Sequence, residues 1–246
     1  MRARQGEFKR PPKRYEPKGL TILFEDRDIV VVDKAVGLLT VSTRKVQENT
    51  AYFLLNDYVR KGNRKSKNRV YIVHRLDRDT SGVLVFAKNE NAKYFLQDEW
   101  KNFEKKYYAV VHGAMENERG VITSYLAENS IHRMYSVTSA SQGKLAKTGY
   151  KVLMTSPKYS LLELDLLTGR KNQIRVHLAD KGCPVAGDKK YGIKGKDRGM
   201  KRLALHAASI TFAHPFSGEQ MNITTQVPPY FEFLMKRSLR GLGPSD

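Results

Sequence analysis

The sequence predicts an α+β fold, with a mainly antiparallel sheet whose flanking helices and loops surround a central cleft. Short apolar runs typical of strands outnumber helix-like stretches, and the two do not alternate in a regular βαβ order. The chain has 246 residues, of which 40% are hydrophobic, so it is long enough to bury a large core.

The first half of the chain contains two expected strands and two expected helices. Apolar runs at residues 29–33 and 83–87 are typical of buried strands. Residues 49–60 carry apolar side chains at helical spacing, which predicts an amphipathic helix. A second helix is expected behind Asn89, a plausible N-cap, with Trp100 on its apolar face.

The second half is richer in strands. Strands are expected at residues 106–111 and 159–167, with several short ones between 121 and 154. A helix is expected over residues 172–181, and residues 203–227 again resemble strands. The glycines expected to form turns among the short strands are Gly120, Gly143 and Gly149.

Residues 1–18 are basic and interrupted by prolines, so we expect them to form a mobile arm. One folded domain is expected over residues 19–240. The sequence has no apolar run long enough to span a membrane and no secretory signal, and its single cysteine, Cys183, allows no internal disulfide. We therefore expect a cytoplasmic protein, and a monomer by default.

The charge balance of 44 basic against 25 acidic residues, a net +19, points to a polyanionic partner. Basic residues cluster in segments 1–18, 60–69 and 189–202. Three separate clusters favour nucleic acid. An anionic membrane is the weaker alternative, because no cluster lies on an apolar-faced helix.

A dense polar string at residues 73–82 directly precedes the second apolar run. It reads Val-His-Arg-Leu-Asp-Arg-Asp-Thr-Ser-Gly. Such residues can simply close a turn. Buried charge must be paired and hydrogen-bonded, however, so a functional site explains the string equally well. Asp77 is its candidate reactive group.

Other chemistries find no support in the motifs. The six histidines lack metal-ligand spacing, so no metal site is expected. Phosphate-binding loops and a nucleophile elbow are absent. A carboxylate near arginines suits a nucleophile or base, and work on one base of a nucleic acid requires flipping it out. Arg75 could then fill the stack, and Tyr107 or Tyr108 could line the pocket, although core packing would also explain these tyrosines.

Four segments together resemble the RluA-type RNA pseudouridine synthases over residues 20–230. The string His74–Gly82 followed by Ala87-Lys88 is similar to their catalytic motif, and residues 28–38 to their first motif. Residues 105–109 (Lys-Lys-Tyr-Tyr-Ala) and 169–178 (Gly-Arg-Lys-Asn-Gln-Ile-Arg-Val-His-Leu) match two further motifs, the second continued by residues 184–188. The RsuA-type relatives fit less well.

The resemblance implies an isomerase that converts uridine in structured RNA to pseudouridine without metal or cofactor. Asp77 would be the catalytic aspartate, Arg75 the residue that fills the vacated stack, Tyr107 the pocket tyrosine and Arg175 the partner of Asp77. Residues His74, Arg170 and Gln173 are expected to bind the substrate. Attack on C1′, attack on the base and a glycal route all stay open.

Two departures from the family pattern stand out. Lys171-Asn172 replaces the usual Thr-His, which we expect to alter RNA contact while Asn172 caps the helix. An S4-like module ahead of the catalytic domain is not expected. Ribosomal RNA of the large subunit and transfer RNA are both open as targets. The alternative function is a non-catalytic RNA-binding protein or RNA chaperone on the same fold.

Overall fold

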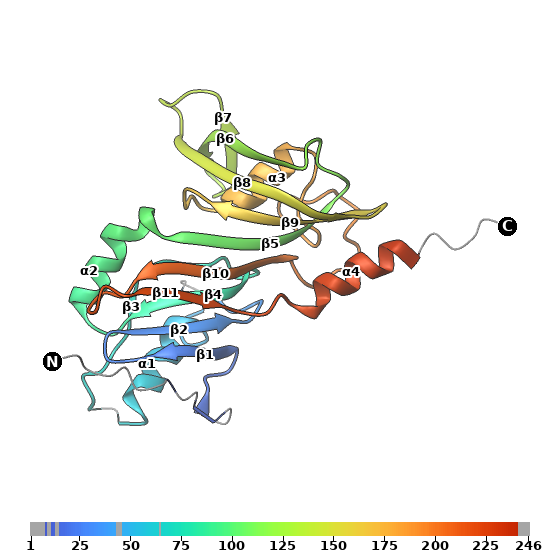
Figure 1. Cartoon of the computed structure of the whole chain (residues 1–246). Coiled ribbons are helices and arrows are strands. Elements are labelled where there is room, and N and C mark those ends of the chain that lie inside the picture. The colour runs from blue at the N-terminus through green and yellow to red at the C-terminus, as the bar shows by residue number, and fades with distance from the viewer. Residues whose placement is uncertain (1–7, 9–10, 13–14, 43–45, 64, 241–246) are drawn as a thin grey trace. The chain divides into compact units, whose positions relative to one another are not determined.

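The structure, a computed structural model, describes residues 8, 11–12, 15–42, 46–63 and 65–240. Figure 1 shows its elements, which form two compact units. The first unit is Met1–Phe103 with Thr211–Thr225, and the second is Glu104–Ile210 with Gln226–Asp246. Most of the expected arm lies outside the described residues, and a single domain over residues 19–240 stays a prediction.

The first unit is built on an antiparallel meander. Its strands are β1 (Leu20–Glu25), β2 (Ile29–Lys34), β3 (Tyr71–Ile72), β4 (Ser81–Ala87) and β11 (Gln220–Thr224), and its helices are α1 (Ala51–Arg60), α2 (Glu90–Asp98) and the 3₁₀ helix η2 (Glu99–Asn102). Strand β2 lies between β1 and β4, and β3 pairs with the end of β4. Almost every side chain of β2 and β4 is buried, which explains their continuous apolar runs.

Both α-helices of the first unit begin with a side-chain cap. Asn89 accepts a hydrogen bond from a first-turn N–H at 2.9 Å, as predicted, and Thr50 caps α1 in the same way. The prediction that the second helix continues through Trp100 is wrong. Helix α2 ends at Asp98, and the chain tightens into η2, where the Trp100 ring stacks on His74 with centroids 4.3 Å apart.

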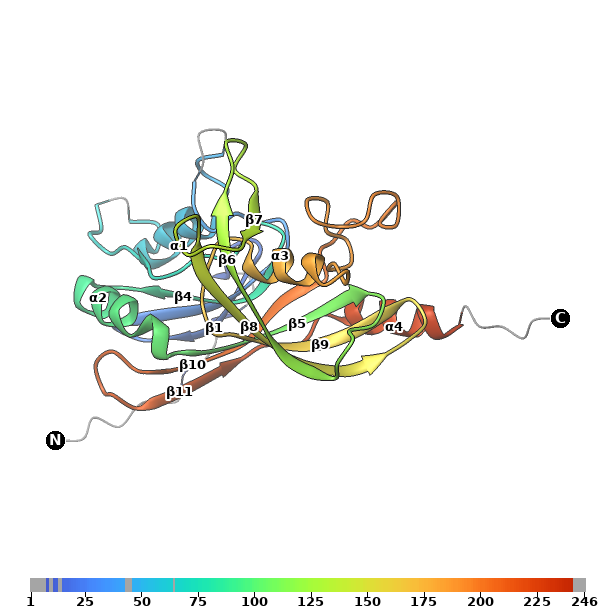
Figure 2. The ribbon, with the colours of Figure 1, turned by 90° about the horizontal axis from the view of Figure 1, so that it is seen from above.

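The second unit carries longer antiparallel strands. Its strands are β5 (Glu104–His112), β6 (Arg119–Glu128), β7 (Met134–Val137), β8 (Lys144–Thr155) and β9 (Tyr159–Leu166), and its helices are α3 (Gln173–Asp180) and α4 (Pro229–Arg240). The strand order is β5-β9-β8-β6-β7. Figure 2 shows α3 against β6, β7 and β8, all of which it contacts. Strand β10 (Leu205–Ala213) contributes residues to both units.

Two of the three glycines expected in turns lie inside strands. Gly120 belongs to β6 and Gly149 to β8, whereas Gly143 does lie in the turn before β8. A Cβ atom on Gly120 would come within 2.9 Å of the Tyr150 hydroxyl on the paired strand. The lack of a side chain on Gly120 therefore leaves room for the Tyr150 ring on the paired strand.

Helix α4 is the one helix of the described residues that the sequence analysis did not anticipate. It begins at Pro229 and buries Phe231, Leu234 and Met235, which follow helical spacing. The predicted class, α+β with a mainly antiparallel sheet, is confirmed. None of the described helices is both long and apolar enough to cross a bilayer.

Candidate active site

The predicted catalytic string forms the connection between β3 and β4, and its last residues, Ser81 and Gly82, already belong to β4. Hydrogen bonds to the main chain of this connection fix it on both sides of Asp77. The buried Thr40 hydroxyl donates to the carbonyl of Leu76 at 2.8 Å and accepts from its N–H at 3.2 Å. The carbonyl of Arg78 accepts from the N–H of Gly37 at 2.8 Å. Both neighbours of Asp77 are therefore held in place.

The side chain of Lys34 also donates a hydrogen bond to the main chain of this connection, at Arg78. This side chain is fully buried at the end of β2, and its ammonium donates to the carbonyls of Ala35, Leu38 and Arg78 at 3.1, 2.8 and 3.2 Å. Burial lowers the pKa of Lys34 to about 8, although the carboxylates of Asp79 and Asp77 favour its charged form. The buried ammonium of Lys34 is thus in contact with the loop that carries Asp77.

Asp77 itself is half-buried, and Arg75, two residues earlier, is exposed. The N–H of Thr80 donates to the carbonyl of Asp77 at 3.2 Å, which closes a turn. A carboxylate on a fixed turn, half open to solvent and close to a buried cation, is suited to act as a nucleophile or a base.

His74 forms a hydrogen bond with β4 beyond the point where β3 ends. Strand β3 pairs with β4 only as far as Ile72, and the N–H of Val85 donates to Nε2 of His74 at 3.0 Å. The imidazole takes the place of the next strand carbonyl, and its ring stacks on Trp100. His74 therefore orients the polar string against β4.

The two candidate tyrosines occupy opposite faces of β5. Tyr107 shares its face with Lys105 and Ala109 and is only 8% exposed. Tyr108 points the other way, and its hydroxyl bonds to Glu163 at 3.3 Å. Only Tyr107 therefore lies on the buried face of the strand.

Arg175 of α3 forms a buried, two-pronged ion pair with Asp188. Its Nε and Nη2 each donate to a carboxylate oxygen of Asp188 at 2.7 Å. Burial alone would raise the pKa of Asp188, but the bonds from Arg175 and from two backbone N–H groups lower it below its usual value. The fork fixes the orientation of the guanidinium. The predicted pairing of Arg175 with Asp77 joins residues of different units and stays a prediction.

Gln173 and Arg170 make internal contacts at the start of α3. The buried Gln173 amide accepts from the Thr168 hydroxyl and the Arg170 N–H, and it donates to the Lys147 carbonyl and the Thr148 hydroxyl. All of its hydrogen-bonding capacity is used within the protein. Arg170 is exposed and donates through Nε to the carbonyl of Leu145 at 3.0 Å. Gln173 thus shapes the segment that presents Arg170.

The expectation that Asn172 caps α3 is wrong. Its side chain makes no capping bond, and its backbone adopts the left-handed conformation with φ of 52°. Asparagine tolerates that conformation better than most residues. The Tyr191 hydroxyl donates to its side-chain oxygen at 3.2 Å, and the neighbouring Lys171 pairs with Glu128 at the end of β6. Lys171 and Asn172 thus connect the start of α3 to the end of β6 and to Tyr191.

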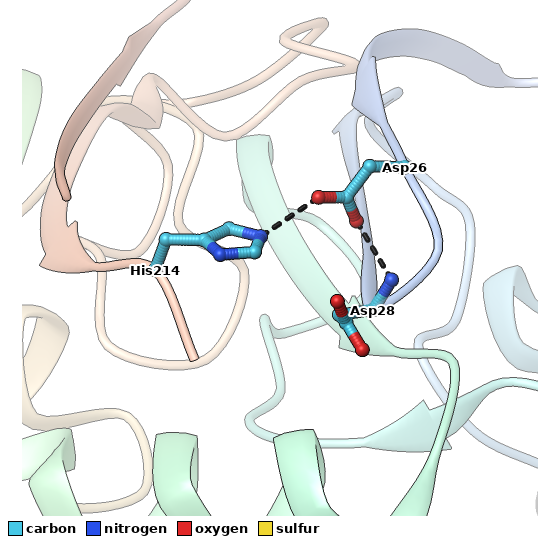
Figure 3. A group of neighbouring side chains, drawn as sticks. All are labelled: Asp26, Asp28 and His214. Carbon is cyan, nitrogen blue, oxygen red and sulfur yellow. Dashed lines mark hydrogen bonds and ion pairs between the residues drawn. The ribbon is translucent and has the colours of Figure 1, made fainter. Parts of the chain in front are cut away.

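One cluster in the first unit has the composition of a metal site. Asp26, Asp28 and His214 place their ligand atoms within 4.8 Å of one another (Figure 3). Nδ1 of His214 accepts from the N–H groups of Phe216 and Ser217. The ring proton of neutral His214 therefore lies on Nε2, which donates to Asp26 at 2.7 Å.

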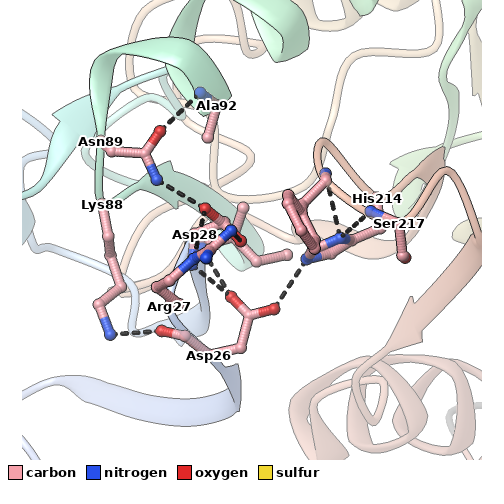
Figure 4. Close-up of polar contacts among 10 residues, drawn as sticks. Asp26, Arg27, Asp28, Lys88, Asn89, Ala92, His214 and Ser217 are labelled. Carbon is pink, nitrogen blue, oxygen red and sulfur yellow. Dashed lines mark hydrogen bonds and ion pairs between the residues drawn. The ribbon is translucent and has the colours of Figure 1, made fainter. Parts of the chain in front are cut away.

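The remaining oxygens of this cluster are also hydrogen-bonded. The other oxygen of Asp26 accepts from the N–H groups of Asp28 and Ile29, and Asp28 accepts from the side chain of Asn89 at 2.7 Å (Figure 4). The cluster joins the β1–β2 turn to the start of α2 and to the turn after β10. These bonds explain its geometry without an ion, and the absence of a metal in the reaction stays a prediction.

Two residues that hold the loop around Asp77 were not identified as site residues from the sequence. Thr40 and Lys34 hold the loop around Asp77, yet they lie at least 37 residues before it. Their signal was weak, because a lone threonine is unremarkable and lysine is normally a surface residue.

Known proteins resemble this chain in sequence. The family model for RNA pseudouridylate synthase matches residues 28–180. The chain is 38% identical over 220 residues to the uncharacterized RNA pseudouridine synthase MG209 of Mycoplasma genitalium, covering 88% of this chain and 70% of that protein. It is 37% identical over 210 residues to ribosomal large subunit pseudouridine synthase D of Nitrosomonas europaea, covering 81% and 60%.

The fold has a counterpart among solved structures. Human RNA pseudouridylate synthase domain containing 4 superposes with a TM-score of 0.73 and 25% sequence identity. The similarity covers 89% of this chain and 92% of the human one.

Proposed function

The chain belongs to the RNA pseudouridylate synthase family, and we propose that Asp77 is the residue on which its isomerisation of uridine in RNA depends. The predicted RluA-type resemblance is confirmed. In this reaction the bond from C1′ to N1 breaks, the base rotates and C1′ bonds to C5. C5 then releases its proton and N1 takes one up, so the product is an isomer of uridine. Attack on C1′, attack on the base and a glycal route are all compatible with a carboxylate at Asp77.

The fixed loop around Asp77 carries this proposal. Thr40 and Gly37 form hydrogen bonds with the backbone on either side of Asp77, and the ammonium of Lys34 donates to a carbonyl of the same loop. A reacting group gains most when its geometry is set in advance, because a displacement of about 1 Å can cost about 100-fold in rate. The loop presents one half-exposed carboxylate in this way.

Arg75 is proposed to fill the stack that the flipped uridine leaves. It is exposed and lies on the same held loop as Asp77. Unstacking a base costs a few kcal/mol, so a side chain that occupies the gap lowers the barrier to flipping. A planar guanidinium can stack on the neighbouring bases.

The second unit is proposed to supply the pocket. Tyr107 would lie beside the uracil, and Arg175, oriented by Asp188, would pair with Asp77. Arg170 would contact the RNA backbone, while Gln173 would act through the position of Arg170. His74, which packs between β4 and Trp100, would act in the same indirect way on Arg75.

Ribosomal RNA of the large subunit is the proposed target, with transfer RNA as the second candidate. Relatives from Nitrosomonas europaea and Zymomonas mobilis are named for the large ribosomal subunit. We propose that the chain works as a monomer in the cytoplasm, where both RNAs occur. Mapping pseudouridine in both RNAs, with and without the gene, distinguishes the two targets.

Release of tritium from RNA labelled at C5 of uridine tests the reaction, because C5 loses its hydrogen when pseudouridine forms. The substrate is total RNA from a strain lacking the gene. We expect Asp77→Asn, which keeps the shape and removes the charge, to lower the single-turnover rate by about 1,000-fold or more. Asp57→Asn, which neutralises an exposed carboxylate on α1 of the same unit, is the control and should retain most of the rate.

Full activity of Asp77→Asn would overturn the assignment of Asp77. A wild-type protein that binds these RNAs but releases no tritium would instead support the alternative, an RNA-binding protein on this fold.

A further inference from the structure

The segment from Lys189 to Arg202, hereafter the basic loop, separates its charges by sign. It carries seven Lys and Arg residues and one acid, Asp197. Six of the seven cations are exposed: Lys189, Lys194, Lys196, Arg198, Lys201 and Arg202. Within the part of the chain that the structure describes, none of these six forms an ion pair. Asp197, by contrast, has a largely buried side chain.

Asp197 anchors the basic loop to the sheet of the second unit. Its Oδ1 lies 2.7 Å from Nε2 of His112 on β5 and accepts from the N–H of Gly187 at 2.9 Å. The Asp197 and His112 side chains are only 13% and 7% exposed. The second oxygen of Asp197 is buried without a hydrogen-bond partner among the described residues, so the anchor forms although burying this charge is costly.

The basic loop is also closed and internally packed. The N–H of Ala204 donates to the carbonyl of Ala186 at 2.9 Å, which joins the two ends of the segment. A Cβ atom on Gly187, whose φ is 78°, would lie 2.0 Å from the carbonyl oxygen of Arg202. A Cβ atom on Gly192 would similarly collide with the Asp188 carbonyl. Such close backbone contacts are typical of a compact Ω-loop with a defined shape.

We propose that the basic loop is a preformed docking surface for the RNA phosphate backbone, held in shape by the Asp197–His112 contact. Unpaired cations that are crowded on a fixed loop repel one another, and a polyanion relieves that repulsion. A preformed surface also loses less conformational entropy on binding than a flexible segment of the same charge. The proposal rests on the proposed function only in its choice of RNA as the polyanion.

The first experiment measures how salt weakens binding to a fluorescent 30-nucleotide oligouridylate. Each phosphate neutralised on a single strand contributes about 0.7 to the slope of log affinity against log salt. Replacing Lys194, Lys196 and Arg198 together by Gln should lower that slope by about 2. The control replaces three exposed cations elsewhere in the second unit, Arg119, Lys151 and Lys158, and should change the slope much less. Equal changes would overturn the proposal.

The second experiment separates shape from charge. Asp197→Ala removes the anchor but raises the net charge by one, so electrostatic attraction alone predicts tighter binding. The proposal predicts binding about fivefold weaker or more, because the cations lose their fixed arrangement. Glu118→Ala removes an exposed acid of the same unit and should bind as tightly as the wild type or slightly tighter. Unchanged or tighter binding by Asp197→Ala would overturn the role of the anchor.

Limited trypsin digestion shows directly whether the loop is released. Trypsin cleaves after Lys and Arg, so Asp197→Ala should be cut faster within the basic loop, with other sites unchanged. Faster cleavage throughout the chain would indicate general unfolding. Asp197→Asn, which keeps a neutral acceptor, would then test the anchor in a folded protein, with an effect smaller in size and equal in sign.

Two further measurements separate this proposal from its alternatives. Asp77→Asn should bind with the wild-type salt slope, so loss of reaction and loss of docking are distinguishable. Phosphatidylserine vesicles test a membrane as the partner. If the triple Gln variant lost vesicle binding but kept the full RNA salt slope, the surface would belong to a membrane and the proposal would fail.

Discussion

The ammonium of Lys34 donates to the carbonyl oxygen of Arg78 at 3.2 Å and so links the end of β2 to the residue after Asp77. Two more carbonyls, of Ala35 and Leu38, accept from the same ammonium. A neutral amine has two N–H donors and could not satisfy all three. The charged state of Lys34 is therefore part of the geometry around Asp77.

Lys34→Met should lower the single-turnover rate by about 10- to 100-fold while RNA affinity changes less than about twofold. Methionine is close to lysine in length, but it removes the ammonium that donates to three carbonyls and so removes the cation near Asp77. Tritium release at saturating RNA measures the rate, and fluorescence anisotropy measures the affinity. Lys88→Met, which alters a paired lysine of the same unit, is the control for general destabilisation. Equal losses in the two variants would show that Lys34 has no specific role.

The pKa of Lys34, about 8, predicts opposite trends for activity and stability in alkaline solution. Above pH 8 the folded protein loses this proton, so the rate should fall. The unfolded chain keeps the proton to about pH 10.5, so between these values it binds more protons than the folded protein. The contribution of Lys34 to the free energy of unfolding should therefore rise with pH. Rate and urea-unfolding profiles of wild type and Lys34→Met between pH 7.5 and 9.5 measure both trends, and an unchanged rate profile in Lys34→Met would contradict the first.

Asp188→Asn should destabilise the protein by about 3 kcal/mol or more, because it removes the charged carboxylate that forms the buried, bidentate ion pair with Arg175. The control is Asp165→Asn, which breaks an exposed pair with Lys106 in the same unit and should cost at most about 1 kcal/mol. Urea unfolding measures both. Similar losses in the two variants would mean that the fork is not a major source of stability.

The sequence predicted the central strands better than it predicted the residues that support the string at 73–82. The apolar run of β4 and the capped start of α2 are local patterns, and both are confirmed. The link from Lys34 to Arg78 joins residues 44 positions apart through a side chain that is normally exposed, so local patterns could not reveal it. Asn172 shows a different limit, because its position matched a cap but its backbone adopted another conformation.

The basic loop and α4 show that some signals were present but not used. Asp197, the one acid among the seven cations, was visible in the sequence, but its inward direction depends on His112, 85 residues away. The start of α4 at Pro229, with Phe231, Leu234 and Met235 at helical spacing, could have been predicted. That signal is short and directly follows residues 203–227, which resemble strands.

His177 should make the protein less stable as the pH falls below about 6.5. It is fully buried in α3 between the hydroxyls of Ser124 and Thr148, and burial lowers its pKa to about 4. Between these pH values the unfolded chain binds a proton that the folded protein does not, so stability decreases with falling pH, by at most about 3 kcal/mol. The lowered pKa of Asp188 affects stability only at more acidic pH, near its usual 3.8 and below.

His177→Gln isolates this contribution, because glutamine can bond to both hydroxyls and does not titrate in this range. Urea unfolding of wild type and variant at pH 7.5, 6 and 5 gives the difference in free energy at each pH. The wild type should lose its advantage over the variant progressively from pH 6.5 downward. A constant difference would mean that the imidazole takes up its proton over the same pH range in the folded protein as in the unfolded chain. The buried contacts with Ser124 and Thr148 would then have to hold a charged ring at pH 5.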